Sequence, residues 1–183
     1  MVLLRKKFPQ NHNLQTAVVR GVRFVLMRYK YRITKYDPKN RNEDGHYHVN
    51  EWTAMSDIGK NFSGNVLTKE EYLSVENNYL FALEAFLAEG NVACLNISSL
   101  EGGEKYNFVQ GQTLELRKIL EIARLSLREE LWCKLSLNRQ AYIHFGYDYY
   151  MYIGVSRKCK KAIGSAENKG LFVEPYRSPY LRG

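Results

Sequence analysis

Histidine is the side chain in this sequence best suited to proton transfer near neutral pH. His46 and His48 stand two residues apart with Glu51 close behind, and two imidazoles on one strand face can bind a metal or shuttle protons. Because no further ligand follows at a metal-site spacing, we interpret this pair as part of a solvated turn. His144 and Asp148 would lie about 13 Å apart on an extended strand, so they can meet only across a tight turn. We interpret His144 as a partly buried, hydrogen-bonded side chain.

Two alternatives depend on these residues. An RNA-processing nuclease would need His46, His48 or His144 in a cleft with a lysine or a second base. A small nucleic-acid-binding module would need the basic run at 157–161, RKCKK, to continue into exposed aromatic rings. We interpret that run as a solvated strand end or loop, so nucleic-acid binding is not the expected function. We also expect no enzymatic activity, no metal, no cofactor and no small-molecule ligand.

Tyrosine suggests binding more than catalysis. The chain has 14 tyrosines, and those between positions 147 and 152 are nearly continuous. A strand with aromatic residues on both faces either packs between two layers or presents some of its rings to a partner, since tyrosine is enriched at protein interfaces. The candidate partner-binding residues are Trp52, Asp57, Tyr147, Asp148, Tyr149 and Tyr150.

The strands that would position these residues are predicted from the alternation of residue types with a period of two along the sequence. Residues 131–155 hold the longest alternating run, which predicts a meander of strands at 131–137, 141–147 and 149–155; one long strand over 141–155 is the alternative. Further strands are predicted at 28–36, 91–100, 106–109 and 171–180. Residues 56–65 predict an irregular loop, and we expect the loop at 52–59 to share an edge with the ends of the strands.

Two helices are predicted from capping and periodicity. Thr68 and Glu71 form a capping box, and an apolar stripe at helical spacing follows, with Glu76 on the opposite, solvent-facing side. Gly90 ends this helix at a position that favours the left-handed conformation. A second amphipathic helix is predicted to begin at Thr113.

These elements predict an α+β fold, a mostly antiparallel sheet with two amphipathic helices packed on it. At 183 residues and 45% hydrophobic, the chain matches one domain. The three cysteines have no paired spacing and indicate reduced thiols in a cytoplasmic protein. No apolar run reaches the roughly 20 residues of a membrane helix, so no membrane partner is expected.

Residues 1–26 differ from the rest. They contain five basic residues and no acidic one, and so carry most of the formal net charge of +8. We interpret them as a basic N-terminal extension outside the core fold, with residues 27–183 forming the single α+β domain and Met27 as a candidate natural start. Residues 16–26 could still add an edge strand.

Five segments carry a resemblance over roughly residues 27–180. They read YRITKYDP, EWTAMSDIGK, LTKEEYLSVENNY, REELWCKL with YIHFGYDYYMYIG, and LFVEPYRSPY. In their order and spacing they resemble a family of small bacterial proteins similar to the immunity proteins of polymorphic or contact-dependent toxin systems. The resemblance implies a non-enzymatic, cytoplasmic domain that binds and neutralises a cognate protein toxin, and it supplies no catalytic residue.

Overall fold

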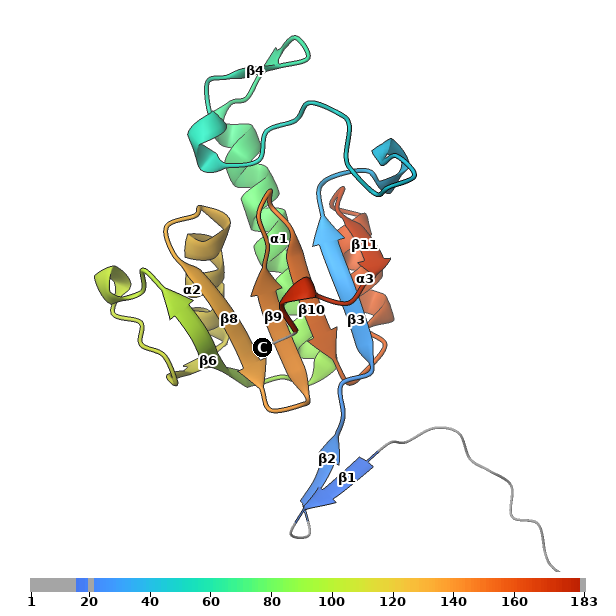
Figure 1. The fold of residues 1–183 in the computed structure, drawn as a ribbon, viewed down its shortest axis with the longest axis vertical. Helices are drawn as coiled ribbons and strands as arrows, with labels where there is room; N and C mark the ends of the chain where they lie inside the picture. Colours follow the sequence, from blue (N-terminus) through green and yellow to red (C-terminus); the bar gives the residue numbers. More distant parts are fainter. Residues whose placement is uncertain (1–15, 20–21, 182–183) are drawn as a thin grey trace, which may run out of the picture.

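The computed structural model describes residues 16–19 and 22–181, with only the backbone described for 16–25. Strands β1 (Thr16–Val19) and β2 (Val22–Val25) form a two-stranded antiparallel hairpin separate from the main sheet (Figure 1). The expected edge strand at 16–26 is therefore a hairpin that does not join the main sheet. Whether residues 1–26 belong to the core fold stays a prediction, and residues 1–15 lie outside the described residues.

The main sheet has seven strands, all paired antiparallel, in the order β11-β3-β10-β9-β8-β6-β7. The strands are β3 (Tyr29–Thr34), β6 (Cys94–Glu101), β7 (Thr113–Glu115), β8 (Trp132–Leu137), β9 (Ala141–Phe145), β10 (Met151–Val155) and β11 (Phe172–Pro175). The meander β8-β9-β10 is confirmed, and the alternative of one long strand over 141–155 is wrong, because the chain turns back between β9 and β10.

Three helices cover one face of this sheet (Figure 1), α1 (Lys69–Gly90), α2 (Leu116–Leu127) and α3 (Lys160–Glu167). Side chains of one parity, such as Ile33, Ile143 and Ile153, point to these helices and are fully buried. The predicted α+β class is confirmed. Among the described helices, none has both the length and the apolar run that crossing a membrane requires.

Helix α1 begins as predicted and ends one residue later than predicted. Thr68 Oγ1 accepts from the Glu71 amide while Glu71 accepts from the Thr68 amide. The left-handed residue is Asn91, with φ of 56°, not Gly90. Gly90 instead favours close packing: a Cβ atom there would make a tight contact, 3.1 Å from Val155 Cγ1, so glycine eases the approach of α1 to β10.

Other boundaries differ from the prediction where pairing between elements overrides the local pattern. Thr113 does not begin a helix but starts β7, and its hydroxyl donates to Asn96 Oδ1 on β6. Residues 106–109 are not a strand: a 3-10 helix, Glu104–Tyr106, is followed by a turn that buries Phe108. The loop at 56–65 contains a 3-10 helix, Met55–Asp57, and a small hairpin of β4 (Asn61–Phe62) and β5 (Asn65–Val66).

Helix α3 is not among the predicted helices, and its first two residues belong to the basic run at 157–161, which we interpret as a solvated strand end or loop. It packs on α1 and β11 through Ala162 and Ala166, which are four residues apart and buried. Its first turn is capped by another element, since the Glu89 carboxylate on α1 accepts from the Ala162 amide at 2.8 Å. Such a cap gives no signal in the local sequence.

The second face of the sheet is covered in part by a strap, residues 176–181, which follows β11 and crosses β10 and β9 (Figure 1). Ser178 of the strap is buried and contacts His144, and Tyr180 packs edge-on against Trp132 with ring centroids 6.0 Å apart. Every residue of β9 and β10 is therefore buried, on both faces.

Glu76 is the largest departure from the amphipathic pattern of α1. The pattern places it in water, yet only 1% of its side chain is exposed. Arg128, directly after α2, donates to it from Nε and Nη2, each at 2.8 Å, and Arg124 Nε lies 3.7 Å away. The carboxylate therefore joins α1 to α2 within the helical layer.

We expect Arg128→Leu to lower the free energy of unfolding by about 3 kcal/mol, because it leaves the Glu76 carboxylate buried without its main partner. The double variant Glu76→Leu/Arg128→Leu should recover most of this loss. Urea denaturation measures both. As a control, Lys118→Ala removes an exposed pair with Glu121 and should cost less than about 1 kcal/mol. Equal losses of unfolding free energy in Arg128→Leu and in the double variant would contradict the assignment of Arg128 as the main partner of the buried Glu76 carboxylate.

Candidate partner-binding surface

The turn between β9 and β10 holds two successive residues in the left-handed conformation. Asp148 has φ of 58° and Tyr149 has φ of 64°, and the Tyr150 amide donates to the Tyr147 carbonyl at 3.4 Å. Tight hairpin turns of this kind normally use Asn-Gly or Asp-Gly, since the left-handed conformation costs an L-residue about 1–2 kcal/mol. A bulky tyrosine at the second position needs compensating contacts.

Tyr149 obtains these contacts from the aromatic residues beneath the turn. Its ring packs edge-on against Trp52, Tyr72 and Tyr79, with centroids 5.1 to 5.8 Å apart. The Tyr79 hydroxyl donates to the Tyr149 carbonyl at 2.8 Å and accepts from the Lys35 amide at 2.7 Å. The turn is thus held to α1 and to the end of β3.

The same turn directs the neighbouring candidates outward. Tyr147 is 79% exposed, the most exposed of the large hydrophobic side chains that the structure describes. Asp148 is exposed and Tyr150 is half-buried. Of the predicted tyrosine anchors, Tyr147 is therefore the one with a free ring, while Tyr149 serves as its support.

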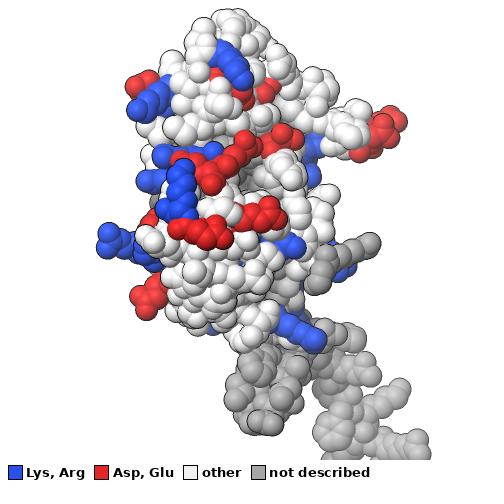
Figure 2. All heavy atoms as spheres, turned by 60° about the vertical axis from the view of Figure 1, so that its left-hand side comes forward, with Lys and Arg blue, Asp and Glu red and all other residues white. Residues whose placement is uncertain are grey.

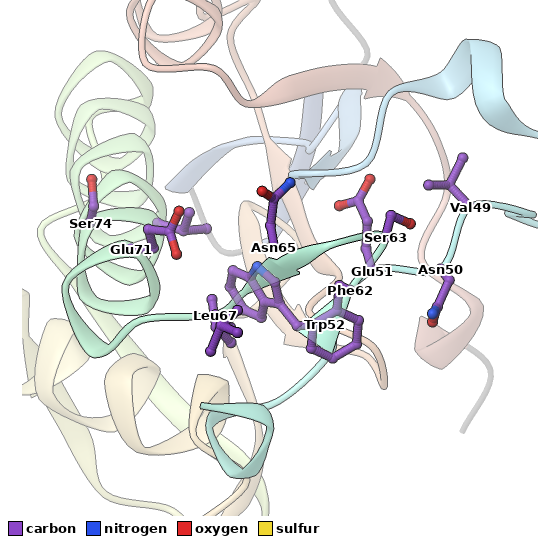
Figure 3. A pocket seen from close by; sticks show the side chains of 12 residues that line it. Val49, Asn50, Glu51, Trp52, Phe62, Ser63, Asn65, Leu67, Glu71 and Ser74 are labelled. Atoms are coloured by element: carbon purple, nitrogen blue, oxygen red, sulfur yellow. The ribbon is translucent and has the colours of Figure 1, made fainter. Parts of the chain in front are cut away.

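Trp52 lies on the other side of the turn and fastens the loop before α1. Lys35 Nζ sits 4.1 Å from the Trp52 ring centroid, and the ring forms one wall of a hollow of about 470 Å³ (Figure 3). Residues around this Trp52 hollow include Phe62, Val66, Leu67, Glu71 and Val75. The expected shared edge between the loop at 52–59 and the strand ends is present in the ring contact between Trp52 and Tyr149.

Asp57 is held inside its own loop. Its carboxylate accepts from the Thr53 and Ala54 amides and pairs with Lys60 at 2.7 Å. Although burial opposes ionisation, the Lys60 contact and the two amides keep the pKa of Asp57 below its usual value. These contacts occupy both carboxylate oxygens and shape the loop that carries Trp52.

A second hollow, of about 670 Å³, opens beside Tyr147, and we call it the tip hollow. It joins four segments that are distant in sequence: the end of β6, the α2–β8 connection, the β9–β10 turn and the strap. Its aromatic and acidic lining residues are Trp132, Phe145, Tyr147, Tyr180, Glu101, Glu129 and Glu130. Of these residues only Tyr147 is a predicted site residue, because nothing in a single sequence places the other segments together.

The histidines do not form a common site. His144 is 4% exposed, stacks on Tyr142 and has its Nδ1 atom 2.8 Å from Ser178 Oγ, so its partner is Ser178 and not Asp148. Burial, together with the positive charge of Lys134, lowers the pKa of His144 to about 4. His46 and His48 lie exposed in the loop after β3. The contacts found among the described residues do not join either of them to His144.

Two further predictions concern metal and nucleic-acid binding. Within residues 16–19 and 22–181, no group of three His, Cys, Asp or Glu side chains is placed to hold a metal ion. The basic run at 157–161 follows β10, so it lies at the opposite end of that strand from Tyr147. Cys133 and Cys159 are buried, Cys94 is half-buried, and all three are free thiols.

Comparison with protein-family models, curated proteins and solved structures finds no match to this chain. The resemblance to immunity proteins therefore stays a prediction, and function has to be argued from the surface itself.

We expect Tyr79→Phe to lower the free energy of unfolding by about 1–3 kcal/mol, because the Lys35 amide and the Tyr149 carbonyl both lose their partner. Tyr31→Phe is the matched control: its buried hydroxyl has no hydrogen-bond partner, so its loss should be neutral or stabilising. Thermal and urea denaturation compare the two. A Tyr31→Phe variant as unstable as Tyr79→Phe would contradict this account.

His144 should make stability depend on pH. Its pKa is about 4 in the folded protein and about 6.5 in the unfolded chain, so the unfolded chain binds more protons between these values. The contribution of His144 to the free energy of unfolding is then complete above about pH 6.5 and falls by about 3 kcal/mol as the pH drops to 4. In His144→Gln this contribution disappears. Between pH 7 and pH 4.5, urea denaturation should show a smaller loss of unfolding free energy in the variant than in the wild type. Equal losses in the two proteins would show that His144 is not the source of the pH dependence.

Proposed function

We propose that this chain is a non-enzymatic protein-binding domain, an immunity protein that binds and neutralises a cognate toxin. The observation that carries the proposal is the β9–β10 turn, where a strained, well-supported backbone holds Tyr147 out of the core. Strain of this kind is found at functional sites, and exposed aromatic residues beside hollows are typical of interaction surfaces.

The position of this surface also favours binding of another macromolecule. Two hollows flank the turn, one at Trp52 and one at Trp132, so a partner that covers Tyr147 can contact both. Its scaffold is a rigid layer of packed strands and rings, which lowers the entropic cost of association. Inhibition would result from covering the toxin's active site or fixing it in an inactive conformation.

The nuclease alternative is less well supported. His144 shares a hollow with Lys134, which the alternative requires, but its Nδ1 atom is engaged with Ser178. With a pKa of about 4, its imidazole is a weak base at neutral pH. Ribonuclease activity that disappears in His144→Gln and persists in a stability-matched variant would establish the alternative instead.

Co-expression tests the proposed function directly. If a toxin is encoded next to this gene, its C-terminal fragment should arrest growth when expressed alone, and the present chain should restore growth and co-elute with the fragment on gel filtration. Absence of both rescue and complex would reject an immunity function for this pair.

Tyr147→Ala should weaken that complex by about 30-fold, because a central aromatic anchor contributes about 2 kcal/mol to binding. The melting temperature should not change, since the ring is exposed. Phe81→Ala is the matched control: Phe81 is an exposed aromatic on α1 that packs with Lys169 beside α3. Calorimetric titration of each variant with the toxin fragment gives the comparison. Equal affinities for wild type and Tyr147→Ala would remove Tyr147 from the interface.

A further inference from the structure

The tip hollow has an aromatic wall that is already fixed in place. The Trp132 indole N–H donates to the Phe145 carbonyl at 3.1 Å, which sets the plane of the ring. Tyr180 packs edge-on against it, and the Tyr180 hydroxyl lies 3.4 Å from where a Cβ atom on Gly146 would stand. A ligand that enters this hollow therefore meets ordered rings, and little conformational entropy is lost on binding.

The rim of the hollow is acidic on a chain whose net charge is +8. Glu101, Glu129 and Glu130 are all exposed, and among the described residues none of them forms an ion pair. Glu130 accepts a hydrogen bond from the Tyr106 hydroxyl. Figure 2 shows acidic side chains gathered on this side of the molecule, with basic side chains among them.

The nearby cations compensate this rim only in part. Lys105 lies against the Tyr106 ring, 5.0 Å from its centroid, and acts on Glu130. Arg128 is held by the buried Glu76 carboxylate, and Lys134 lies against the Trp132 ring, 5.4 Å from its centroid, where it lines a separate hollow. The tip hollow thus combines the carboxylates of Glu101 and Glu129, which form no ion pair among the described residues, with the faces and edges of aromatic rings. Both kinds of group attract a cation, and they do so in the same space.

We propose that the tip hollow receives an arginine side chain of the partner protein. A guanidinium group can stack its plane on Trp132 or Tyr147 and present its fork of N–H donors to the glutamates, which a compact ammonium group cannot do equally well. Arginine is also enriched among the residues that dominate interface energy. A volume of about 670 Å³ admits the side chain together with part of its backbone. This inference rests on the proposed function, because the arginine belongs to the bound protein.

The test uses the full chain and a probe with a single guanidinium group, Nα-acetyl-arginine N-methylamide. Its neutral isostere, the citrulline analogue, is the matched ligand control. In ¹H–¹⁵N correlation spectra we expect the probe to shift the Trp132 indole and Gly146 amide signals in a saturable way, at millimolar concentration. The Trp52 indole signal serves as an internal reference and should stay in place, and the citrulline analogue should cause no saturable shift.

Charge variants complete the test. Glu101→Gln/Glu129→Gln should weaken binding of the probe about tenfold. Glu84→Gln/Glu167→Gln changes the net charge equally at exposed positions of α1 and α3, outside the hollow, and should bind as the wild type does. Equal binding of the citrulline analogue, or equal weakening by both double variants, would overturn the proposal.

The outcome separates this inference from the proposed function. If the toxin fragment binds and growth is rescued while the arginine probe causes no shift at Trp132, the arginine site is wrong and the immunity function stands. If the probe binds as expected and the toxin fragment forms no complex, the cation site stands and the proposed partner is wrong.

Discussion

The hydroxyl group of Tyr79 is the contact on which the candidate surface depends. It accepts from the amide that follows β3 and donates to the carbonyl of Tyr149, so one buried atom joins the helical layer, the sheet and the β9–β10 turn. This hydrogen bond and the ring contacts with Trp52 and Tyr72 together offset the unfavourable left-handed conformation of Tyr149. The ring of Tyr149 points into the core and that of Tyr147 stays in water.

Burial of β9 and β10 on both faces explains why the functional candidates gather at the ends of the strands. The helices cover one face and the strap covers much of the other, so alternate side chains such as Ile143 and His144 are equally enclosed. The exposed side chains of this hairpin therefore lie in the turn that joins β9 to β10. The Trp52 hollow and the tip hollow both lie at the end where the turn emerges.

The sequence predicts those parts of the fold that depend on short-range patterns. The capping box at Thr68 and the alternation in 131–155 are local signals, and both gave the correct elements. Glu76 and α3 were missed because the partner of Glu76 and the cap of α3 come from other elements. The candidate site shows the same division: Tyr147 and Trp52 stand out by residue type, whereas the carboxylates around Trp132 come together only through the fold.

The place of β3 in the sheet has a consequence for the order of folding. This early strand lies between β10 and β11, which are translated far later in the chain. Until they emerge from the ribosome, Ile33 and its neighbours have no sheet partner, so closure of the sheet requires contacts of long sequence separation. Such topologies fold slowly, and the apolar face of β3 has no sheet partner until β10 has been translated.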